Sequence, residues 1–264
     1  MSALDLVDLG DGLVEARLRS PPLNELGEAL LADLEAVAAR LPSLRGLLLS
    51  SGLERGFSAG ADLRGLAAAI ASRGHAAVLA DVRGFVERIG RALTALDQAP
   101  IPVVCALHGV VFGGGLELAL VADLRVADRT ARFAFPELRL GLVPGFGGVA
   151  RLARDVGLGH VRELLLTGRS LNAEAARAAG LVGQVVAEGR ARDVAARALE
   201  QAARHDPGAT AAAKRLAKPP LEAALAAERE AFLALFARPA AARALARFVE
   251  RDGAEPLPYL AEPT

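Results

Sequence analysis

The stretch VVFGGGLELALVAD, residues 110–123, places three consecutive glycines, Gly113–Gly115, and one carboxylate, Glu117, inside an otherwise apolar run. Regular buried elements disfavour both features, because glycine is costly inside them and charges are rarely buried without a partner. The pattern predicts a strand that ends in a glycine loop and passes into a helix. A second stretch, FSAGAD at residues 57–62, also follows an apolar run and precedes a helical pattern. These two loops organise the prediction of fold and function.

Strand-to-helix junctions of this kind leave backbone N–H groups free, and small residues let a ligand approach them. One loop alone offers half of an anion site. Two loops brought together would direct two N–H donors at a single oxygen, which is an oxyanion hole. The alternative for either loop is a tight-packing turn. Neither loop continues into the Gly-Lys-Ser/Thr of a phosphate loop, and the first lacks the dinucleotide-binding glycine spacing.

Two glutamates lie close to glycine-rich turns in apolar surroundings. Glu117 follows the three glycines, and Glu137 lies in FAFPELRLGLVPGFGG, residues 133–148. Burial raises the pKa of a carboxyl and a helix N-terminus lowers it, so such a pair can divide the roles of acid and base. Taken singly, each glutamate is better explained as a cap or as the partner of an arginine. Taken with the two loops, the pair favours catalysis.

Composition excludes several classes of protein. The 264 residues are 53% hydrophobic, which permits a large core, and 31 basic residues balance 31 acidic ones, which argues against binding driven by nucleic-acid phosphates. One cysteine, Cys105, rules out a disulfide framework and a cysteine zinc site. Residues 101–122 are long enough to span a membrane, but Pro102 and the glycines interrupt them, and the N-terminus lacks a signal-peptide pattern. We expect a cytoplasmic protein that binds neither membrane nor nucleic acid.

The order of the periodic segments predicts an α/β fold with mainly parallel strands. Strands are expected at 13–19, 44–51 and 101–109, with two short ones in 124–137, and helices at 25–40, 75–97, 147–157 and 161–168. A helix, a glycine turn and a strand are expected in 172–186. Strand patterns stop near residue 195, and the remainder is rich in helix-forming residues to about 252.

The combination of GFSAGADL, HGVVFGGGLELALVADLRVA and FAFPELRLGLVPGFGG resembles the motifs of the crotonase superfamily of enoyl-CoA hydratases and isomerases. The early PPLNEL and the later LLLTGRSLNAEAARAAGLVGQVV are also similar, and the resemblance covers residues 13–252. It implies a spiral of repeated ββα turns followed by a C-terminal helical trimerisation region. The corresponding domain prediction is a spiral core at 1–195 and a helical oligomerisation region at 196–264.

The resemblance implies an acyl-CoA thioester substrate. The backbone N–H groups of Ala61 and Gly114 would hold its carbonyl oxygen, Glu117 and Glu137 would act as the acid–base pair, and the N–H of Gly145 would face the same site. Positions expected to contact substrate or CoA are Ala59, whose carbonyl matches an adenine contact, Phe57, Asp62, Arg55, Arg64, Phe112, Phe232 and Arg251. Phe232 and Arg251 match positions that reach the CoA of a neighbouring subunit. Arg55 and Arg64 are placed either at CoA phosphates or on a solvated surface, and Asp62 is expected to cap its loop.

Both glutamates match those of true hydratases, so hydration of a 2-enoyl-CoA, or the reverse dehydration, is the expected reaction. Δ3,Δ2-isomerisation is the alternative, and a non-catalytic CoA-ester binder is the rival from another class. No metal or redox cofactor is expected, and the expected assembly is a homotrimer or a dimer of trimers. The sequence departs from the family pattern in GGVARL, in the bulky Phe112 and in RPAAARALA near the C-terminus. These departures leave the acyl chain and the subunit contacts open.

Overall fold

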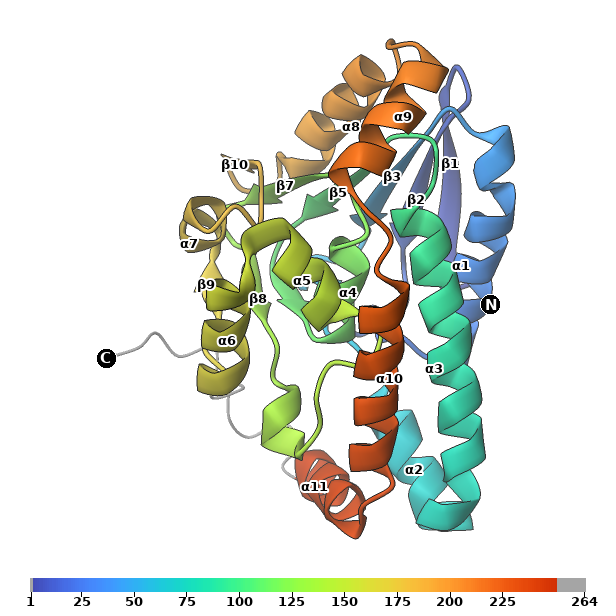
Figure 1. Ribbon diagram of the computed structural model, residues 1–264, viewed down its shortest axis with the longest axis vertical. Coiled ribbons are helices and arrows are strands. Elements are labelled where there is room, and N and C mark those ends of the chain that lie inside the picture. Colours follow the sequence, from blue (N-terminus) through green and yellow to red (C-terminus); the bar gives the residue numbers. More distant parts are fainter. Residues whose placement is uncertain (1, 251–264) are drawn as a thin grey trace.

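The computed structural model describes residues 2–250, whose ten strands form two sheets (Figure 1). The first sheet has the order β1-β2-β3-β5-β7-β10, and the second has the order β4-β6-β8-β9. The strands are β1 Leu4–Gly10, β2 Leu13–Leu18, β3 Gly46–Ser51, β4 Gly56–Ser58, β5 Val103–Leu107, β6 Val110–Phe112, β7 Leu124–Asp128, β8 Arg132–Ala134, β9 Leu171–Asn172 and β10 Gln184–Val186.

The chain winds as a spiral in which each turn gives one strand to each sheet. β3, β5 and β7 pair in parallel in the first sheet, and β4, β6 and β8 pair in parallel in the second. Parallel neighbours need a crossover, and helices supply it after β4 and after β6. The predicted ββα repeat is therefore confirmed.

Helices cover both faces of the first sheet. They are α1 Glu28–Arg40, α2 Leu63–Arg73, α3 His75–Asp97, α4 Gly114–Ala119, α5 Gly148–Val156, α6 Leu158–Thr167, α7 Ala173–Ala178, α8 Ala191–Ala202, α9 Pro207–Ala217, α10 Glu222–Phe236 and α11 Pro239–Glu250, with short 3-10 turns at Leu41–Ser43 and Glu137–Leu140. α8 packs on β3, β5 and β7 through a small apolar cluster that includes Leu48, Val104 and Leu199. The main core lies on the opposite face and includes α1, α3 and α4.

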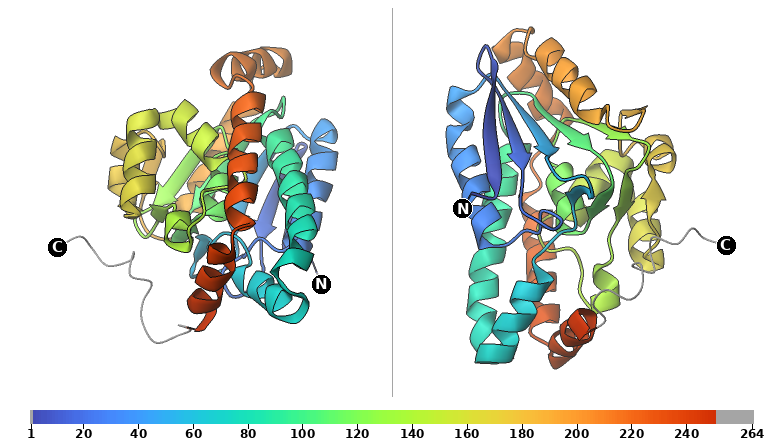
Figure 2. Two further views of the ribbon diagram at one scale, coloured as in Figure 1. Left: turned by 60° about the horizontal axis from the view of Figure 1, so that its bottom comes forward. Right: turned by 180° about the vertical axis from the view of Figure 1, so that it is seen from behind.

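The C-terminal helices lie against the rest of the same chain. α10 contacts α3 and α5, and α11 contacts α2 and the 3-10 turn Glu137–Leu140. Figures 1 and 2 both show α10 running between α3 and the α5–α6 pair. The helical character predicted for this region is confirmed. The boundary predicted at residue 195 falls within α8, and the oligomerisation role stays a prediction.

β1 and β2 form a hairpin at the edge of the first sheet. The strand at β2 was predicted from the sequence, and the strand at β1 was not. β1 pairs antiparallel with β2, and Figure 2 shows the pair from behind. Asp11 and Gly12 connect the strands with φ of 51° and 75°. An Asp-Gly pair between alternating strands is a strong hairpin signal.

A buried carboxylate on β2 joins the sheet to α8. Glu15 is completely buried, and its Oε1 and Oε2 accept hydrogen bonds from Arg192 at 2.8 and 2.6 Å. Arg17 and Ser50 donate to the same carboxylate. Burial opposes ionisation, but these hydrogen bonds outweigh it and lower the pKa of Glu15 to about 2.

Replacing Glu15 with glutamine is expected to lower the free energy of unfolding at neutral pH by about 1–3 kcal/mol, because two arginines lose the negative charge and one of the two acceptor oxygens that they share. The folded-state pKa lies below the ordinary 4.5, so the ionised form stabilises the fold above pH 4.5. That contribution is lost as the pH falls towards 2. Urea unfolding at several pH values measures the difference, with Glu200→Gln, an exposed change on α8, as the control. An equal Glu15→Gln deficit at every pH would contradict the prediction.

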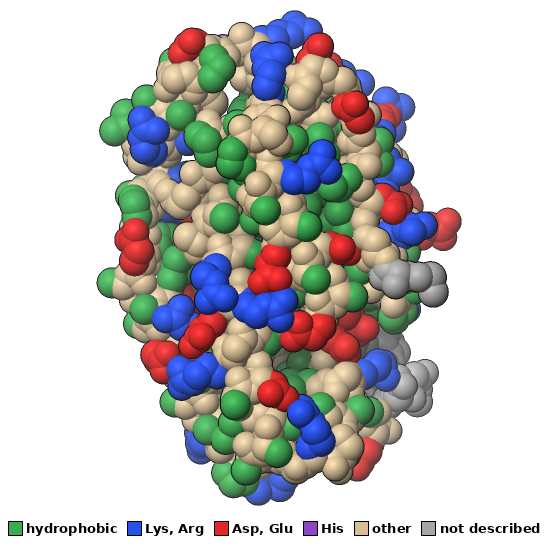
Figure 3. All heavy atoms as spheres, turned by 90° about the vertical axis from the view of Figure 1, so that its right-hand side faces the viewer, with side chains coloured by type: hydrophobic (Ala, Val, Ile, Leu, Met, Phe, Trp, Pro, Cys, Tyr) green, Lys and Arg blue, Asp and Glu red, His purple; other side chains and the backbone are tan. Residues whose placement is uncertain are grey.

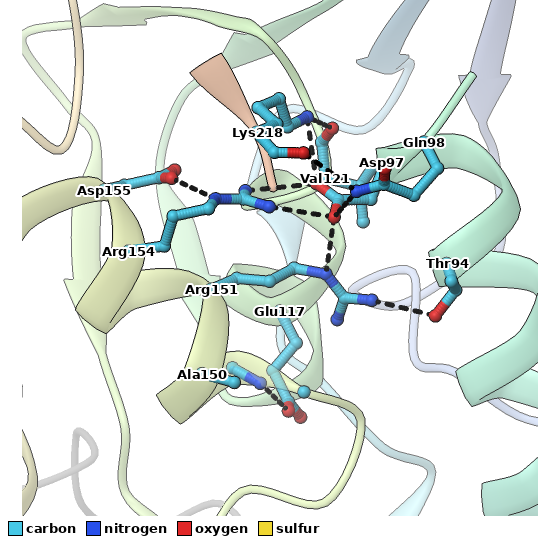
Figure 4. Close-up of polar contacts among 12 residues, drawn as sticks. Thr94, Asp97, Gln98, Glu117, Val121, Ala150, Arg151, Arg154, Asp155 and Lys218 are labelled. Atoms are coloured by element: carbon cyan, nitrogen blue, oxygen red, sulfur yellow. Dashed lines mark hydrogen bonds and ion pairs between the residues drawn. The ribbon is translucent and has the colours of Figure 1, made fainter. Parts of the chain in front are cut away.

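A second ionic cluster joins α3, α5 and the residue that follows α9 (Figure 4). Asp97 is 2.9 Å from both Arg154 and Lys218, and its Oδ2 lies 3.7 Å from Nε of the fully buried Arg151. Arg151 donates to the carbonyl of Phe146 at 2.8 Å and to Thr94 at 3.3 Å. The cluster fixes the start of α5 against α3.

The face formed around α1 and α3 carries acidic and basic side chains interspersed, as Figure 3 shows. Arg88 of α3 bridges Glu28 and Glu35 of α1 at 2.7 Å each. This face therefore lacks the single-sign field that phosphate binding requires. No helix within residues 2–250 combines the length and apolar character that crossing a membrane requires.

Candidate active site

The segment containing Asn24 holds the first loop in place. Asn24 is completely buried at φ 50°, and its side-chain nitrogen donates to the carbonyl of Phe57 at 2.8 Å. Its own carbonyl accepts from Ser58 at 2.7 Å. Leu26 N–H donates to the Gly60 carbonyl at 2.7 Å. The early Pro–Asn element therefore forms one wall of the loop at 57–62.

The two loops predicted from the sequence touch each other. Gly60 has φ 96°, and a Cβ built on it would lie 2.9 Å from both the amide nitrogen of Gly114 and the carbonyl oxygen of Phe112. A side chain at this position would force the loops apart, so glycine is required. β4 and β6 pair in parallel and end together, which brings their following loops to the same edge. The structure therefore brings together the segments that carry Ala61 and Gly114.

Glu117 lies in the short helix α4 and is 2% exposed. Its Oε1 accepts hydrogen bonds from the amides of Phe146 and Gly148, both at 2.8 Å. A Cβ on Gly148 would lie 2.7 Å from Cγ of Glu117, so the turn before α5 packs directly on this side chain. The carboxylate is thus fixed at one oxygen by two backbone donors.

Glu137 follows β8 and reaches the second loop. Phe112 pairs with Ala134, and a Cβ built on Gly113 would lie 2.6 Å from Oε1 of Glu137. Gly113 has φ 50°, so both its conformation and this close approach require glycine. Oε2 of Glu137 is buried and finds no hydrogen-bond partner among residues 2–250. An unpaired buried carboxyl oxygen is costly and is typical of a group that meets a ligand or substrate.

A third carboxylate, which the sequence analysis did not single out, comes from α10. Glu228 is 9% exposed, and it accepts from the amides of Gly147 at 3.1 Å, Val149 at 3.3 Å and Ala150 at 3.0 Å. Its position on the apolar face of α10, three residues after Leu225 and four before Phe232, was a signal in the sequence. Three acidic groups therefore surround the region of the two loops.

Burial raises the pKa of all three glutamates. For Glu137 burial is the largest cause, a hydrogen bond from its own backbone opposes it and the charge of Glu228 adds to it, which brings the pKa to about 8. For Glu117 burial and the charges of Glu228 and Glu137 raise the pKa well above its usual range, against the two amide hydrogen bonds. The pKa of Glu228 is also raised by burial, opposed by its amide donors and by Arg151. The charge of Glu228 therefore raises the pKa of both other glutamates.

Replacing Glu137 with glutamine is expected to stabilise the fold at alkaline pH by about 1–2 kcal/mol, as removal of functional strain often does. Below pH 4.5 the carboxyl of Glu137 is protonated in both the folded and the unfolded chain, so its burial costs no ionisation energy. Between pH 4.5 and about 8 the unfolded chain ionises at this residue and the folded chain does not, so the free energy of unfolding falls as the pH rises. Glutamine has no such loss. Urea unfolding below pH 4.5 and above pH 8 measures the change, with the exposed Glu163→Gln as the control. A variant less stable than the parent at high pH would contradict the prediction.

The remaining predicted residues divide between the loops and the core. Asp62 caps α2 by accepting from Gly65 at 2.8 Å, which confirms its capping role. Ala59 and Ala61 are partly buried beside the loops, whereas Arg55 and Arg64 are exposed and both act electrostatically on Glu25. Whether any of these residues contacts CoA stays a prediction.

Four aromatic or C-terminal positions complete the set. Phe57 is fully buried in the main core and Phe112 is 2% exposed, so neither presents a ring to solvent. Phe232 lies within its own chain beside Gly145, where an added Cβ would be 2.6 Å from its ring. Arg251 lies outside the described residues. The contacts of Phe232 and Arg251 with a neighbouring subunit stay predictions.

Two touching loops with two buried carboxyls beside them, carried on a spiral of ββα turns, are features of the crotonase fold. A family model described as enoyl-CoA hydratase/isomerase matches residues 8–255, and the chain therefore belongs to that family.

Named relatives and solved structures agree with this assignment. The chain is 35% identical to a Rhizobium meliloti (strain 1021) protein named "Probable enoyl-CoA hydratase", over 90% of this chain and 91% of that protein. It is 37% identical to the 2,3-dehydroadipyl-CoA hydratase of Escherichia coli (strain K12), over 81% and 82%. The enoyl-CoA hydratase structure from Bacillus anthracis aligns with a TM-score of 0.75 at 29% identity, over 95% and 97%. That from Bacillus halodurans aligns at 0.83 and 24%, over 93% and 100%, a likeness of fold.

Proposed function

We propose that the protein is an enoyl-CoA hydratase, which adds water across the double bond of a 2-enoyl-CoA thioester or catalyses the reverse dehydration. The observation that carries the proposal is the pair of carboxyls Glu117 and Glu137, in which the charge of Glu137 raises the pKa of Glu117, beside two touching strand-to-helix loops. The relatives named as hydratases support the same reaction class.

In the proposed reaction, the N–H groups of Ala61 and Gly114 donate to the thioester carbonyl oxygen. This polarises the alkene, so that the β-carbon accepts the water oxygen and the enolate that forms is stabilised. Glu117 accepts a proton from the attacking water. Glu137 donates its proton to the α-carbon, and the product is a 3-hydroxyacyl-CoA. Exchange with solvent then restores both protonation states.

The hydrogen bonds support this division of roles. Two amides donate to Glu117, and donors to a carboxylate favour its ionised form. Oε2 of Glu137 has no donor within the described part of the chain, and its pKa is raised to about 8, which favours the protonated form at neutral pH. The pKa of Glu117 is raised as well, by burial and by the charges of Glu228 and Glu137, so the base role is assigned to Glu117 on its two amide donors and not on its pKa. CoA enters as part of the substrate, and the mechanism uses no further cofactor.

Isomerisation of a 3-enoyl-CoA is the second candidate, because two carboxyls on one alkene can also move a proton between carbons. The family description covers both reactions. The acyl chain and the assembly state, trimer or hexamer, are left open by the proposal.

The test is an absorbance assay with crotonyl-CoA. Hydration removes the conjugated enoyl band, and product analysis should give 3-hydroxybutyryl-CoA. A 3-enoyl-CoA substrate should instead generate the band if isomerisation dominates. Binding of both compounds without either change would overturn the proposal in favour of a CoA-ester binder. A panel of enoyl-CoA thioesters would then define the acyl chain.

A further inference from the structure

The turn at the start of α5 is held from two sides by carboxylates. Glu117 accepts hydrogen bonds from the amides of Phe146 and Gly148. Glu228 accepts hydrogen bonds from the amides of Gly147, Val149 and Ala150. Gly147 has φ 100°, which turns successive N–H groups to opposite sides. The amides of five consecutive residues are thus divided between two acids, and a rotation of the turn would break both sets of bonds.

We propose that Glu228 is a positioning residue of the active site, which holds the turn at residues 146–150 so that two of its amides stay on Glu117. The inference rests on the proposed hydratase function for its catalytic consequence. It assigns to α10, in the helical C-terminal region, a part in arranging the acid–base pair.

The alternative is that Glu228 only caps α5. A cap needs an acceptor, and a neutral amide side chain would supply one without a further buried charge. The charge of Glu228 has an effect that a cap does not need, because it raises the pKa of both Glu117 and Glu137. A positioning role therefore predicts changes in catalysis and in titration that a cap does not.

The surroundings of Glu228 show which charges act on it. Arg151 of α5 is the cation that acts on it electrostatically, and Arg151 is shared with Asp97 of α3 at 3.7 Å. Glu117 and Glu137 face it from α4 and the 3-10 turn after β8. In Figure 4, Arg151 lies between Asp97 and Glu117. Arg151 interacts electrostatically with Asp97, Glu117 and Glu228, so its single positive charge neutralises the charge of Glu228 only in part.

The test compares Glu228→Gln with Glu230→Gln, which removes a charge on the exposed side of the same helix, where Glu230 pairs with Arg83. Glu228→Gln is expected to lower kcat for crotonyl-CoA hydration by about ten- to a hundred-fold with KM little changed, as for a misplaced catalytic group. The alkaline limb of the pH–rate profile, assigned to Glu137, should move to lower pH. Glu230→Gln should change neither property. Glu228→Asp, which keeps the charge, should restore the position of the limb and serves if Glu228→Gln does not fold.

Infrared pH titration of the protonated carboxyl band provides a readout that needs no activity, with Glu137→Gln assigning the band. The band of Glu137 should disappear at lower pH in Glu228→Gln than in the parent protein. An unmoved band and an unchanged kcat, with only stability reduced, would overturn the inference and leave a cap. A parent protein that hydrates no enoyl-CoA would overturn the proposed function, while the infrared shift would still decide the role of Glu228.

Discussion

Replacing either Glu117 or Glu137 with glutamine is expected to lower kcat for enoyl-CoA hydration by about 10²–10⁴-fold, the usual contribution of a general acid or base. Glutamine at 117 can still accept the amides of Phe146 and Gly148, so the turn before α5 should stay in place. Binding of a saturated acyl-CoA should therefore be retained. Stopped-flow absorbance measures the rate, and calorimetry measures the binding.

A variant with glutamine at both 117 and 137 tests whether the two glutamates act as one unit. Residues that act as one unit lose activity non-additively, so the double change should cost little more than the worse single change. Glu163→Gln, an exposed glutamate on α6, is the matched control and should retain full activity. Full activity in both single variants would refute the assigned roles.

Removing the N–H of Gly114 is expected to lower kcat by about 10²–10³-fold, the effect of losing one oxyanion donor. Gly114→Pro achieves this, because Gly114 is the first residue of α4 and proline is tolerated at a first helical position. The first N–H of a helix has no intrahelical acceptor, so no helix bond is broken.

Gly114→Ala is the control for crowding. A Cβ at this position would lie 2.9 Å from Leu26 Cδ1 and from Phe146 Cε2, and alanine and proline both carry it. The ratio of the two rates therefore reports the missing N–H. Equal rates for the two variants would show that this amide does not stabilise the enolate.

The long elements of the fold could be predicted from the sequence because each repeats its apolar period several times. The helix at 75–97 was predicted with the bounds of α3. The second sheet could not be predicted in detail, since β4, β6 and β8 are three residues each and are too short to show a period. The predicted strand at 101–109 is in fact β5 at Val103–Leu107, after which β6 begins in the other sheet at Val110.

The acid pair and the two loops could be proposed from the sequence because glycines and lone carboxylates are conspicuous in apolar stretches. The structure supports the proximity of these groups, while their catalytic roles stay predictions. Glu228 was missed because its significance depends on packing between α10 and α5, which are far apart in the sequence. Arg151 was missed for the same reason, since its partner Asp97 lies at the end of α3.

The position of Glu228 near the end of the chain also orders events during synthesis. The ribosome delivers β4, β6 and the turn before α5 well before α10, because they precede it in the chain. Until α10 docks, the amides of Gly147, Val149 and Ala150 face water instead of a carboxylate. A nascent chain that ends before α10 therefore carries both loops and Glu117, but it lacks the carboxylate that accepts these three amides in the finished protein.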